Sequence, residues 1–306
     1  FFPRMPHADE MRKRLYRDFW MNGKQGKPSF LDNMSFFIRY QIGWMYWRYF
    51  MWNFTGRQNG EQGYFPWDPA NGHWISGITP LDNMRLYNQS ELPEYYRNNE
   101  SRNTYFFIPF ILGLIGLIYQ AKRRREEFFG LLALFIITGI GIIVYANSPP
   151  NEPRERDYVL VGSFFVYSMW IGMAVLAIYQ YFKSKVSGTA LAFGASAICL
   201  VAPLLMGFQN FDDLGRRGHY GSRDYANNFL QSCEKNAIIF TYGDNDTYPL
   251  WYAQEVEGIR KDVRVVNLSL IAVDWYINAL RNKINESDGI KLTIPASAYV
   301  GNARDA

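Results

Sequence analysis

YFFIPFILGLIGLIYQ (Tyr105–Gln120) begins a series of four apolar stretches in the middle of this chain. It is followed by FFGLLALFIITGIGIIVY (Phe128–Tyr145), YVLVGSFFVYSMWIGMAVLAIYQYF (Tyr158–Phe182) and TALAFGASAICLVAPLLMGF (Thr189–Phe208). A helix needs about 17–25 apolar residues to cross the hydrocarbon core of a bilayer. Because lipid offers no partner to an unpaired backbone N–H or C=O, the sequence predicts four transmembrane helices.

The composition indicates a membrane block joined to polar segments. Hydrophobic residues make up 48% of the 306 residues, yet the mean hydropathy is −0.21. We therefore expect three parts, an aromatic-rich segment at residues 1–103, the membrane block at 104–208 and a polar part at 209–306. The chain begins at Phe1 without an initiator Met and ends within polar sequence, so we expect a piece of a longer protein. The net charge of +4 is too small to indicate a nucleic-acid partner.

Basic residues predict the orientation of the spans. Short loops that are rich in Lys and Arg stay in the cytoplasm. Such loops occur at Lys122–Arg125, between the first two spans, and at Lys183 and Lys185, between the last two. In the loop at residues 146–157 acidic side chains balance the basic ones. The sequence therefore predicts that this loop and both polar ends lie on the outer side of the membrane.

The aromatic segment Asn33–Phe54 precedes the membrane block. Trp and Tyr favour the headgroup level, so we expect a helix in the membrane interface, with Arg39 and Arg48 reaching the headgroups. A fifth span is the alternative. The following stretch, Gly56–Pro80, is rich in Gly, Pro and Asn and predicts an irregular loop.

A charged cluster ends the loop before the third span. Its arginines, Arg154 and Arg156, have the geometry to bind a phosphate bidentately, and Glu155 or Asp157 would orient them. The prolines before them keep the loop extended. A solvated cluster of salt bridges at the membrane boundary is the alternative.

Further basic residues follow the last span. Arg216 and Arg217 are candidates for binding the phosphate of a lipid-linked donor. General attraction to anionic headgroups is the alternative, because juxtamembrane arginines commonly have that role. The two cysteines, Cys199 and Cys233, form no disulfide framework and no zinc-binding spacing.

The C-terminal part has the pattern of an α/β unit. Apolar runs at Ala237–Tyr242 and Val263–Leu270 predict two strands, the first buried on both faces. A helix that ends near Gly258 separates them, and a second helix is expected at Trp275–Lys283. An amphipathic helix, Ser222–Cys233, precedes the first strand. This order predicts a right-handed crossover and a parallel sheet.

Polar residues follow the first of these strands. Ligands of open parallel sheets bind beyond the carboxyl ends of the strands, where Asp244, Asn245, Asp246 and Thr247 are expected. Asp244 and Asp246 are also candidate oxygen ligands for a divalent metal. Turn and helix-cap chemistry without any ligand is the alternative. A Gly-rich nucleotide-binding motif is absent.

Several stretches carry a resemblance to a known family. They are YQIGWMYWRYFMWNF (Tyr40–Phe54), PRERDY (Pro153–Tyr158), GDNDTYPLWY (Gly243–Tyr252), QEVEGIR (Gln254–Arg260) and Asn267–Tyr276. On these residues the chain resembles the bacteroidete-type multi-pass membrane family catalogued as domain of unknown function 2723. A eukaryotic endoplasmic-reticulum protein O-mannosyltransferase is a relative of that family.

The resemblance implies a GT-C-like α-helical integral membrane protein of the bacterial inner membrane, with an extracytoplasmic C-terminal α/β unit facing the periplasm. It implies a glycosyltransferase that uses a polyprenyl-phosphate sugar donor. The acidic residue that serves as catalytic base in such enzymes is expected in spans outside this chain. Relatives tend to carry Asp-Asp-His-Asp-Arg-Ser where this chain has DDLGRR (Asp212–Arg217), which argues against proton transfer by this stretch.

These features lead to a first hypothesis, transfer of a sugar from the lipid phosphate to a Ser or Thr hydroxyl of an exported protein. In this hypothesis Arg154 and Arg156 neutralise the departing phosphate. Asp244–Thr247 and Trp251 bind the acceptor or the sugar. The alternative is a non-enzymatic structural subunit of an envelope secretion or motility complex. Transport is disfavoured because the four spans contain no charged residue.

Overall fold

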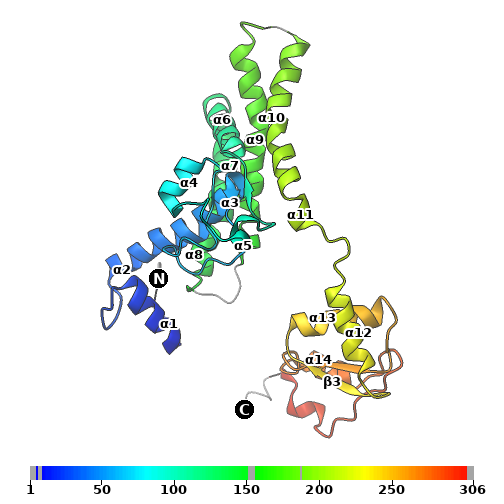
Figure 1. The fold of residues 1–306 in the computed structure, drawn as a ribbon. Helices are drawn as coiled ribbons and strands as arrows, with labels where there is room; N and C mark the ends of the chain where they lie inside the picture. The colour runs from blue at the N-terminus through cyan, green and yellow to red at the C-terminus, as the bar shows by residue number, and fades with distance from the viewer. Residues whose placement is uncertain (1–4, 6–8, 151–155, 187, 302–306) are drawn as a thin grey trace. The chain divides into compact units, whose positions relative to one another are not determined.

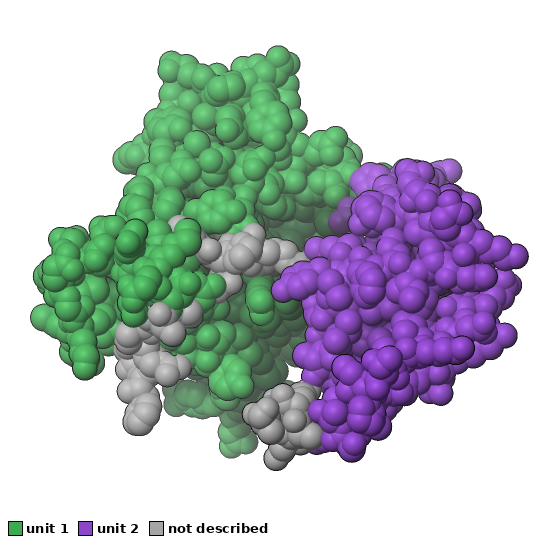
Figure 2. Space-filling view, turned by 90° about the horizontal axis from the view of Figure 1, so that it is seen from below, with its two compact units in different colours: residues 1–215 green, residues 216–306 purple. Residues whose placement is uncertain are grey.

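The computed structural model describes Met5 and residues 9–150, 156–186 and 188–301 (Figure 1). The chain divides into two compact units, unit 1 at residues 1–215 and unit 2 at residues 216–306 (Figure 2). In its described residues, unit 1 is mostly helical and contains one short antiparallel pair of strands. Unit 2 is a small α/β unit with a parallel pair.

The elements of unit 1 follow one another along the chain. Its helices, including three π-helical segments (η1–η3) and one 3₁₀ turn (η4), are α1 (Glu10–Leu15), η1 (Tyr16–Trp20), α2 (Phe30–Phe36), η2 (Phe37–Arg48), α3 (Tyr49–Phe54), α4 (Thr79–Leu86), α5 (Glu94–Arg97), α6 (Ile108–Arg123), α7 (Arg125–Ile136), η3 (Ile137–Gly141), α8 (Ile142–Ala146), η4 (Asp157–Leu160), α9 (Val161–Phe182), α10 (Thr189–Gln209) and α11 (Phe211–Leu214). Strands β1 (Gly56–Arg57) and β2 (Asn103–Thr104) pair antiparallel.

Three helices within the described residues are long and apolar enough to cross a membrane. They are Arg125–Ala146, Tyr158–Phe182 and Thr189–Gln209, and they coincide with three of the four predicted spans. The remaining stretch is also helical, but α6 has only 16 residues. By length and composition, therefore, three helices qualify as spans.

Helix α9 is the centre of the membrane block and packs against α6, α7 and α10 (Figure 1). The contact with α6 is close because α6 presents glycines. A β carbon on Gly116 would lie 1.7 Å from the carbonyl oxygen of Trp170, and one on Gly113 would lie 2.3 Å from the ring of Tyr167. Small residues at such positions let two helices approach in a membrane. The indole N–H of Trp170 also donates to Oε1 of Gln120 at 2.7 Å.

One side of the aromatic segment packs into the protein core. Residues 30–54 form a continuous helical run through α2, η2 and α3, and Tyr46, Phe50 and Phe54 are buried against α9. The expectation that Arg48 reaches the headgroups is wrong, since Arg48 is 4% exposed. The chain after α3 folds back over this run, and the carbonyl of Gly72 accepts from Arg48. Arg39 is exposed.

Of the predicted irregular loop Gly56–Pro80, residues 58–78 are irregular, whereas Gly56 and Arg57 form β1 and Thr79 and Pro80 begin α4. Buried polar side chains hold this region in place. Asp82 is 3% exposed and accepts from the backbone N–H of Ser76 at 2.9 Å. Nε2 of His73 lies 2.7 Å from the carbonyl oxygen of Asp68, and the imidazole packs edge-on against Trp44. Burial lowers the pKa of His73 to about 4, so the ring is neutral at physiological pH.

Unit 2 has the predicted order of elements. They are α12 (Gly221–Gln231), β3 (Ile238–Thr241), α13 (Asp244–Glu255), β4 (Arg264–Asn267), α14 (Asp274–Leu280) and the 3₁₀ turn η5 (Ala296–Ala298). Strands β3 and β4 are parallel, with Ile238 opposite Arg264 and Thr241 opposite Asn267. The predicted parallel βαβ arrangement is confirmed.

The prediction that β3 is buried on both faces is wrong. Ile238 is 47% exposed and Phe240 is 62% exposed. One face of β3 packs, through Ile239, into the cluster formed with α12 and α13. Helix α14 packs against Val266 of β4, and β4 alone is buried along its length. The strand with helices on both of its faces is thus β4.

Candidate functional site

A cavity of about 580 Å³ lies beside the membrane helices of unit 1. Its lining residues come from η2 and the start of α3, from the loop at residues 62–64, from α8 with the chain that follows it, and from η4. Aromatic rings form much of the wall, and they are Tyr40, Trp44, Tyr49, Tyr64 and Tyr145. Two arginines, Arg48 and Arg156, also line it. We call this cavity the arginine pocket.

Arg48 is held rigidly by its surroundings. Its Nε donates to the carbonyl oxygen of Trp44 at 3.0 Å, and its Nη1 donates to that of Gly72 at 2.8 Å. The guanidinium also lies over the ring of Trp44 at 4.4 Å and over that of Trp52 at 4.6 Å. Cation–π contacts of this kind strengthen as the cation is desolvated. The geometry fixes a positive charge in an aromatic wall.

The arginine pocket brings two guanidinium groups together in its lining. Arg156, at the start of η4, is exposed and adds a second guanidinium to the lining. No Asp or Glu occurs among the described residues that line the cavity. A pocket that combines arginines with aromatic rings at the end of membrane helices suits a ligand with an anionic head and an apolar body.

The other predicted phosphate ligands are distributed as follows. Arg154 and Glu155 lie outside the described residues, and so does the side chain of Asp157. Arg216 and Arg217 belong to unit 2 and are exposed. Their phosphate-binding roles stay predictions. Arg48, which sequence reasoning assigned to headgroup contact, is the residue that was missed. A charged residue in the middle of an aromatic run was the signal.

Unit 2 contains a shallow cavity of about 730 Å³ at the start of α13. Asp244 and Asn245 line it, together with the rings of Tyr248 and Tyr252. Arg223 and Glu257 also line it, and Nε of Arg223 donates to both carboxylate oxygens of Glu257, at 2.8 and 3.0 Å. These hydrogen bonds to Glu257 raise the pKa of Arg223. The mixture of rings, amide and charged groups is suited to a polar ligand.

Asp246 and Thr247, the other two residues predicted to bind a ligand beyond β3, instead make hydrogen bonds within unit 2. The carboxylate of Asp246 accepts from the backbone N–H groups of Tyr242 and Gly243, each at 2.8 Å, and caps α13. The hydrogen bond from Tyr242 is the main reason that the pKa of Asp246 is lowered. Thr247 is buried and shares a hydrogen bond of 2.7 Å with Thr241.

Trp251, the remaining predicted acceptor or sugar ligand, packs in the core of unit 2 between the clusters around Leu250 and Val266. Its binding role, like those of Asp246 and Thr247, stays a prediction. Among the described residues no group of three or more His, Cys, Asp or Glu side chains is placed to hold a metal ion. In the suggested metal pair, both oxygens of Asp246 already accept backbone hydrogen bonds.

Residues 222–306 match the family model described as TMEM260-associated domain 2. The matched region contains the described α/β elements of unit 2 from α12 onward. No solved structure matches the chain. The match and the three long apolar helices together indicate a membrane-associated protein.

Proposed function

We propose that this chain is part of a membrane glycosyltransferase that moves a sugar from a polyprenyl-phosphate donor to a Ser or Thr hydroxyl of an exported protein. The observation that carries the proposal is the arginine pocket. Its two guanidinium groups offer a site for phosphate, and its aromatic wall beside α8 and η4 offers a site for the polyprenyl chain. A small, water-soluble phosphate has no apolar part that could pack against these aromatic rings.

The proposed chemistry is a displacement at the anomeric carbon. The acceptor hydroxyl forms the new C–O bond, the bond to the phosphate oxygen breaks, and a general base takes the hydroxyl proton. Negative charge develops on the departing lipid phosphate, where Arg48 and Arg156 stabilise it. Because the carbonyls of Trp44 and Gly72 already orient Arg48, little reorganisation is needed. The base is expected outside this chain, and Asp244 and Asn245 contribute to acceptor binding.

The proposal includes α6 as a fourth span. Its outer surface carries Ile111, Leu114 and Ile118, which are 50%, 37% and 50% exposed, and lipid would cover them. Lys122 and Arg123 at its end would then lie in the cytoplasm. With four spans the polar ends share the outer side, which is the periplasm of the proposed bacterial inner membrane.

The second candidate is a structural subunit of an envelope complex. The exposed side of β3 favours it, since Ile238, Phe240 and the adjacent Tyr242 are 47%, 62% and 74% exposed. An apolar strand surface of this kind is typical of a docking face. Normal glycans on exported proteins in a deletion strain, with the protein recovered in a complex of fixed stoichiometry, would support this function over transfer.

The test of transfer uses the full-length protein in proteoliposomes, a radiolabelled polyprenyl-phosphate mannose or glucose donor, and a Ser/Thr-rich peptide. Arg156→Gln should lower the transfer rate by about 100-fold, the typical effect of removing one group that stabilises developing charge. Arg124→Gln is the matched control, because Arg124 is exposed on the loop after α6 and pairs with Glu127. Transfer at an unchanged rate by Arg156→Gln, or none by the wild type, would reject the proposal.

A further inference from the structure

A second cavity of unit 1, of about 600 Å³, lies where the end of α10 meets the β1–β2 pair. We call it the amide pocket, because side-chain amides provide much of its polar lining. Tyr49 lines both this cavity and the arginine pocket, so the two share a wall at α3. The polar lining residues from these segments are Asn53, Arg57, Asn103, Tyr105 and Asn210.

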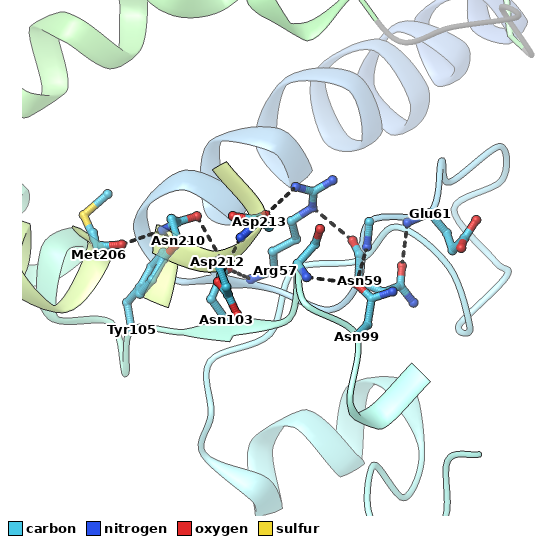
Figure 3. Close-up of polar contacts among 12 residues, drawn as sticks. Arg57, Asn59, Glu61, Asn99, Asn103, Tyr105, Met206, Asn210, Asp212 and Asp213 are labelled. Atoms are coloured by element: carbon cyan, nitrogen blue, oxygen red, sulfur yellow. Dashed lines mark hydrogen bonds and ion pairs between the residues drawn. The ribbon is translucent and has the colours of Figure 1, made fainter. Parts of the chain in front are cut away.

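The amides are fixed in a network (Figure 3). Nδ2 of Asn103 donates to Oδ1 of Asn210 at 3.0 Å. Nδ2 of Asn210 in turn donates to the hydroxyl of Tyr105 and to the carbonyl of Met206, each at 2.6 Å. A chain of polar groups that is already oriented loses little entropy when it binds a ligand.

The wall contains one buried donor that no described residue pairs with. Trp52 is 6% exposed, and its indole N–H has no hydrogen-bond partner among the described residues. A buried donor of this kind calls for an explanation, and a water or a ligand in the cavity would supply the missing acceptor. Trp52 also carries the guanidinium of Arg57 over its ring at 4.6 Å, with that of Arg48 over the same ring at 4.6 Å.

The charge of the amide pocket differs from that of the arginine pocket. Nη1 of Arg57 lies 4.0 Å from Oδ2 of Asp213, whose side chain is 11% exposed. Figure 3 shows the guanidinium between this carboxylate and Asn59, whose carbonyl accepts from Nε at 3.0 Å. The charge of Arg57 is therefore balanced from within the protein, and a neutral ligand is favoured over an anion.

We infer that the amide pocket binds a neutral sugar ring. Sugar hydroxyls are both donors and acceptors, and they match the amides, the guanidinium and the indole N–H. The C–H face of a sugar packs on apolar side chains, which Met206, Phe211 and Leu214 supply in the lining. The inference goes beyond the proposed transfer reaction, because it concerns a separate pocket and needs no catalysis.

The test measures binding of methyl α-mannoside, methyl α-glucoside and methyl N-acetylglucosaminide to the whole chain in lipid nanodiscs, by saturation-transfer NMR and tryptophan fluorescence. At least one glycoside should saturate in the millimolar range. Asn53→Ala and Arg57→Ala should each weaken that binding by about tenfold, since each loses hydrogen bonds to the ligand. Arg97→Ala, an exposed position on α5 outside the lining, should leave it unchanged.

The inference is overturned if none of the three glycosides binds, or if both pocket variants bind as the wild type does while unfolding at its temperature. It is also overturned if Arg57→Ala weakens binding to phosphatidylglycerol vesicles but leaves binding of the glycosides unchanged. A competition arm identifies the source of the sugar. Displacement by polyprenyl-phosphate mannose but not by polyprenyl phosphate places the donor sugar here, whereas no displacement by either lipid places a glycan of the acceptor here.

Both results of the competition support a sugar site. Glycoside binding by a protein that shows no transferase activity would reject the proposed function and retain this inference. Transfer by a protein that binds no glycoside at this pocket would retain the proposed function and reject this inference.

Discussion

The two units use their conspicuous polar residues in different ways. In unit 2, the motif GDNDTY places Asp246 and Thr247 in hydrogen bonds to their own turn and strand, and only Asp244 and Asn245 line a cavity. In unit 1, by contrast, Arg48 stands in an aromatic run away from any cluster of polar residues, and it lines a pocket. Polar residues clustered at a turn mostly form the hydrogen bonds of that turn. A pocket formed by tertiary packing is instead lined by residues that are far apart in the sequence.

The largest effect is expected at the contact that assembles unit 1. Gly116→Leu would drive a side chain into the carbonyl of Trp170, separate α6 from α9 and destabilise unit 1 by about 3 kcal/mol or more. Hydrogen exchange measured by mass spectrometry should rise throughout unit 1 and stay unchanged in unit 2. Gly172→Leu is the matched control, since a β carbon on Gly172 would meet nothing within 4 Å. Uniform exchange in both units would contradict the division into units.

A smaller but still large effect is expected at Arg48. Arg48→Met leaves the carbonyls of Trp44 and Gly72 without their donor and should lower stability by about 2–3 kcal/mol, the usual scale for a charged hydrogen bond. Thermal unfolding monitored by tryptophan fluorescence measures this. The control is Arg39→Met on the same helix, where the side chain is exposed and the midpoint should hardly move. Equal losses in the two variants would remove the distinction between these arginines.

The next effect is a pH dependence caused by His73. Its pKa is 6.5 in ordinary surroundings and about 4 in the folded protein, with burial as the main cause. Between these values the unfolded chain binds a proton that the folded chain excludes, so stability is complete above pH 6.5 and is lost as the pH falls toward 4. The unfolding midpoint of unit 1 should therefore fall by several degrees on acidification from pH 7 to pH 5.

His73→Gln should flatten that profile, whereas His219→Gln, at an exposed position in unit 2, should leave it as in the wild type. A profile that His73→Gln does not alter would assign the pH dependence to other groups.

The smallest effect separates capping from ligand binding in unit 2. Asp246→Ala removes the acceptor for two backbone N–H groups and should cost about 1 kcal/mol of local stability at the start of α13. Asp244→Ala, two residues earlier, should change stability by a few tenths of a kcal/mol at most. Hydrogen exchange of the α13 amides compares the two variants. An equal response would mean that Asp244 is also structural.

The positions of the helices and strands could be predicted from the sequence better than the burial of their side chains. Period and composition located the apolar helices and the order of β3, α13, β4 and α14, because those signals are local. Burial of the aromatic run could not be predicted, since it depends on residues 56–105 folding back onto η2. The exposure of Phe240 depends in the same way on which face of the sheet α14 covers.

The same contrast between local sequence signals and contacts of distant residues applies to the candidate sites. Arg156 was recognised from its local cluster, but Arg48, Arg57 and Asn210 were not assigned to any pocket. The contact between Asn103 and Asn210 joins residues 107 positions apart, and no short motif encodes it.

The most direct test of the central claim compares two lipids that differ only in the head. Binding of polyprenyl phosphate and of the corresponding polyprenol to the full-length protein is measured by native mass spectrometry, with the wild type, Arg156→Gln and Arg124→Gln. We expect the phosphate to bind about 10-fold or more tightly than the alcohol in the wild type and in Arg124→Gln, with the difference lost in Arg156→Gln. Equal binding of the two lipids by the wild type, or a preference for phosphate that survives in Arg156→Gln, would contradict the assignment of the arginine pocket.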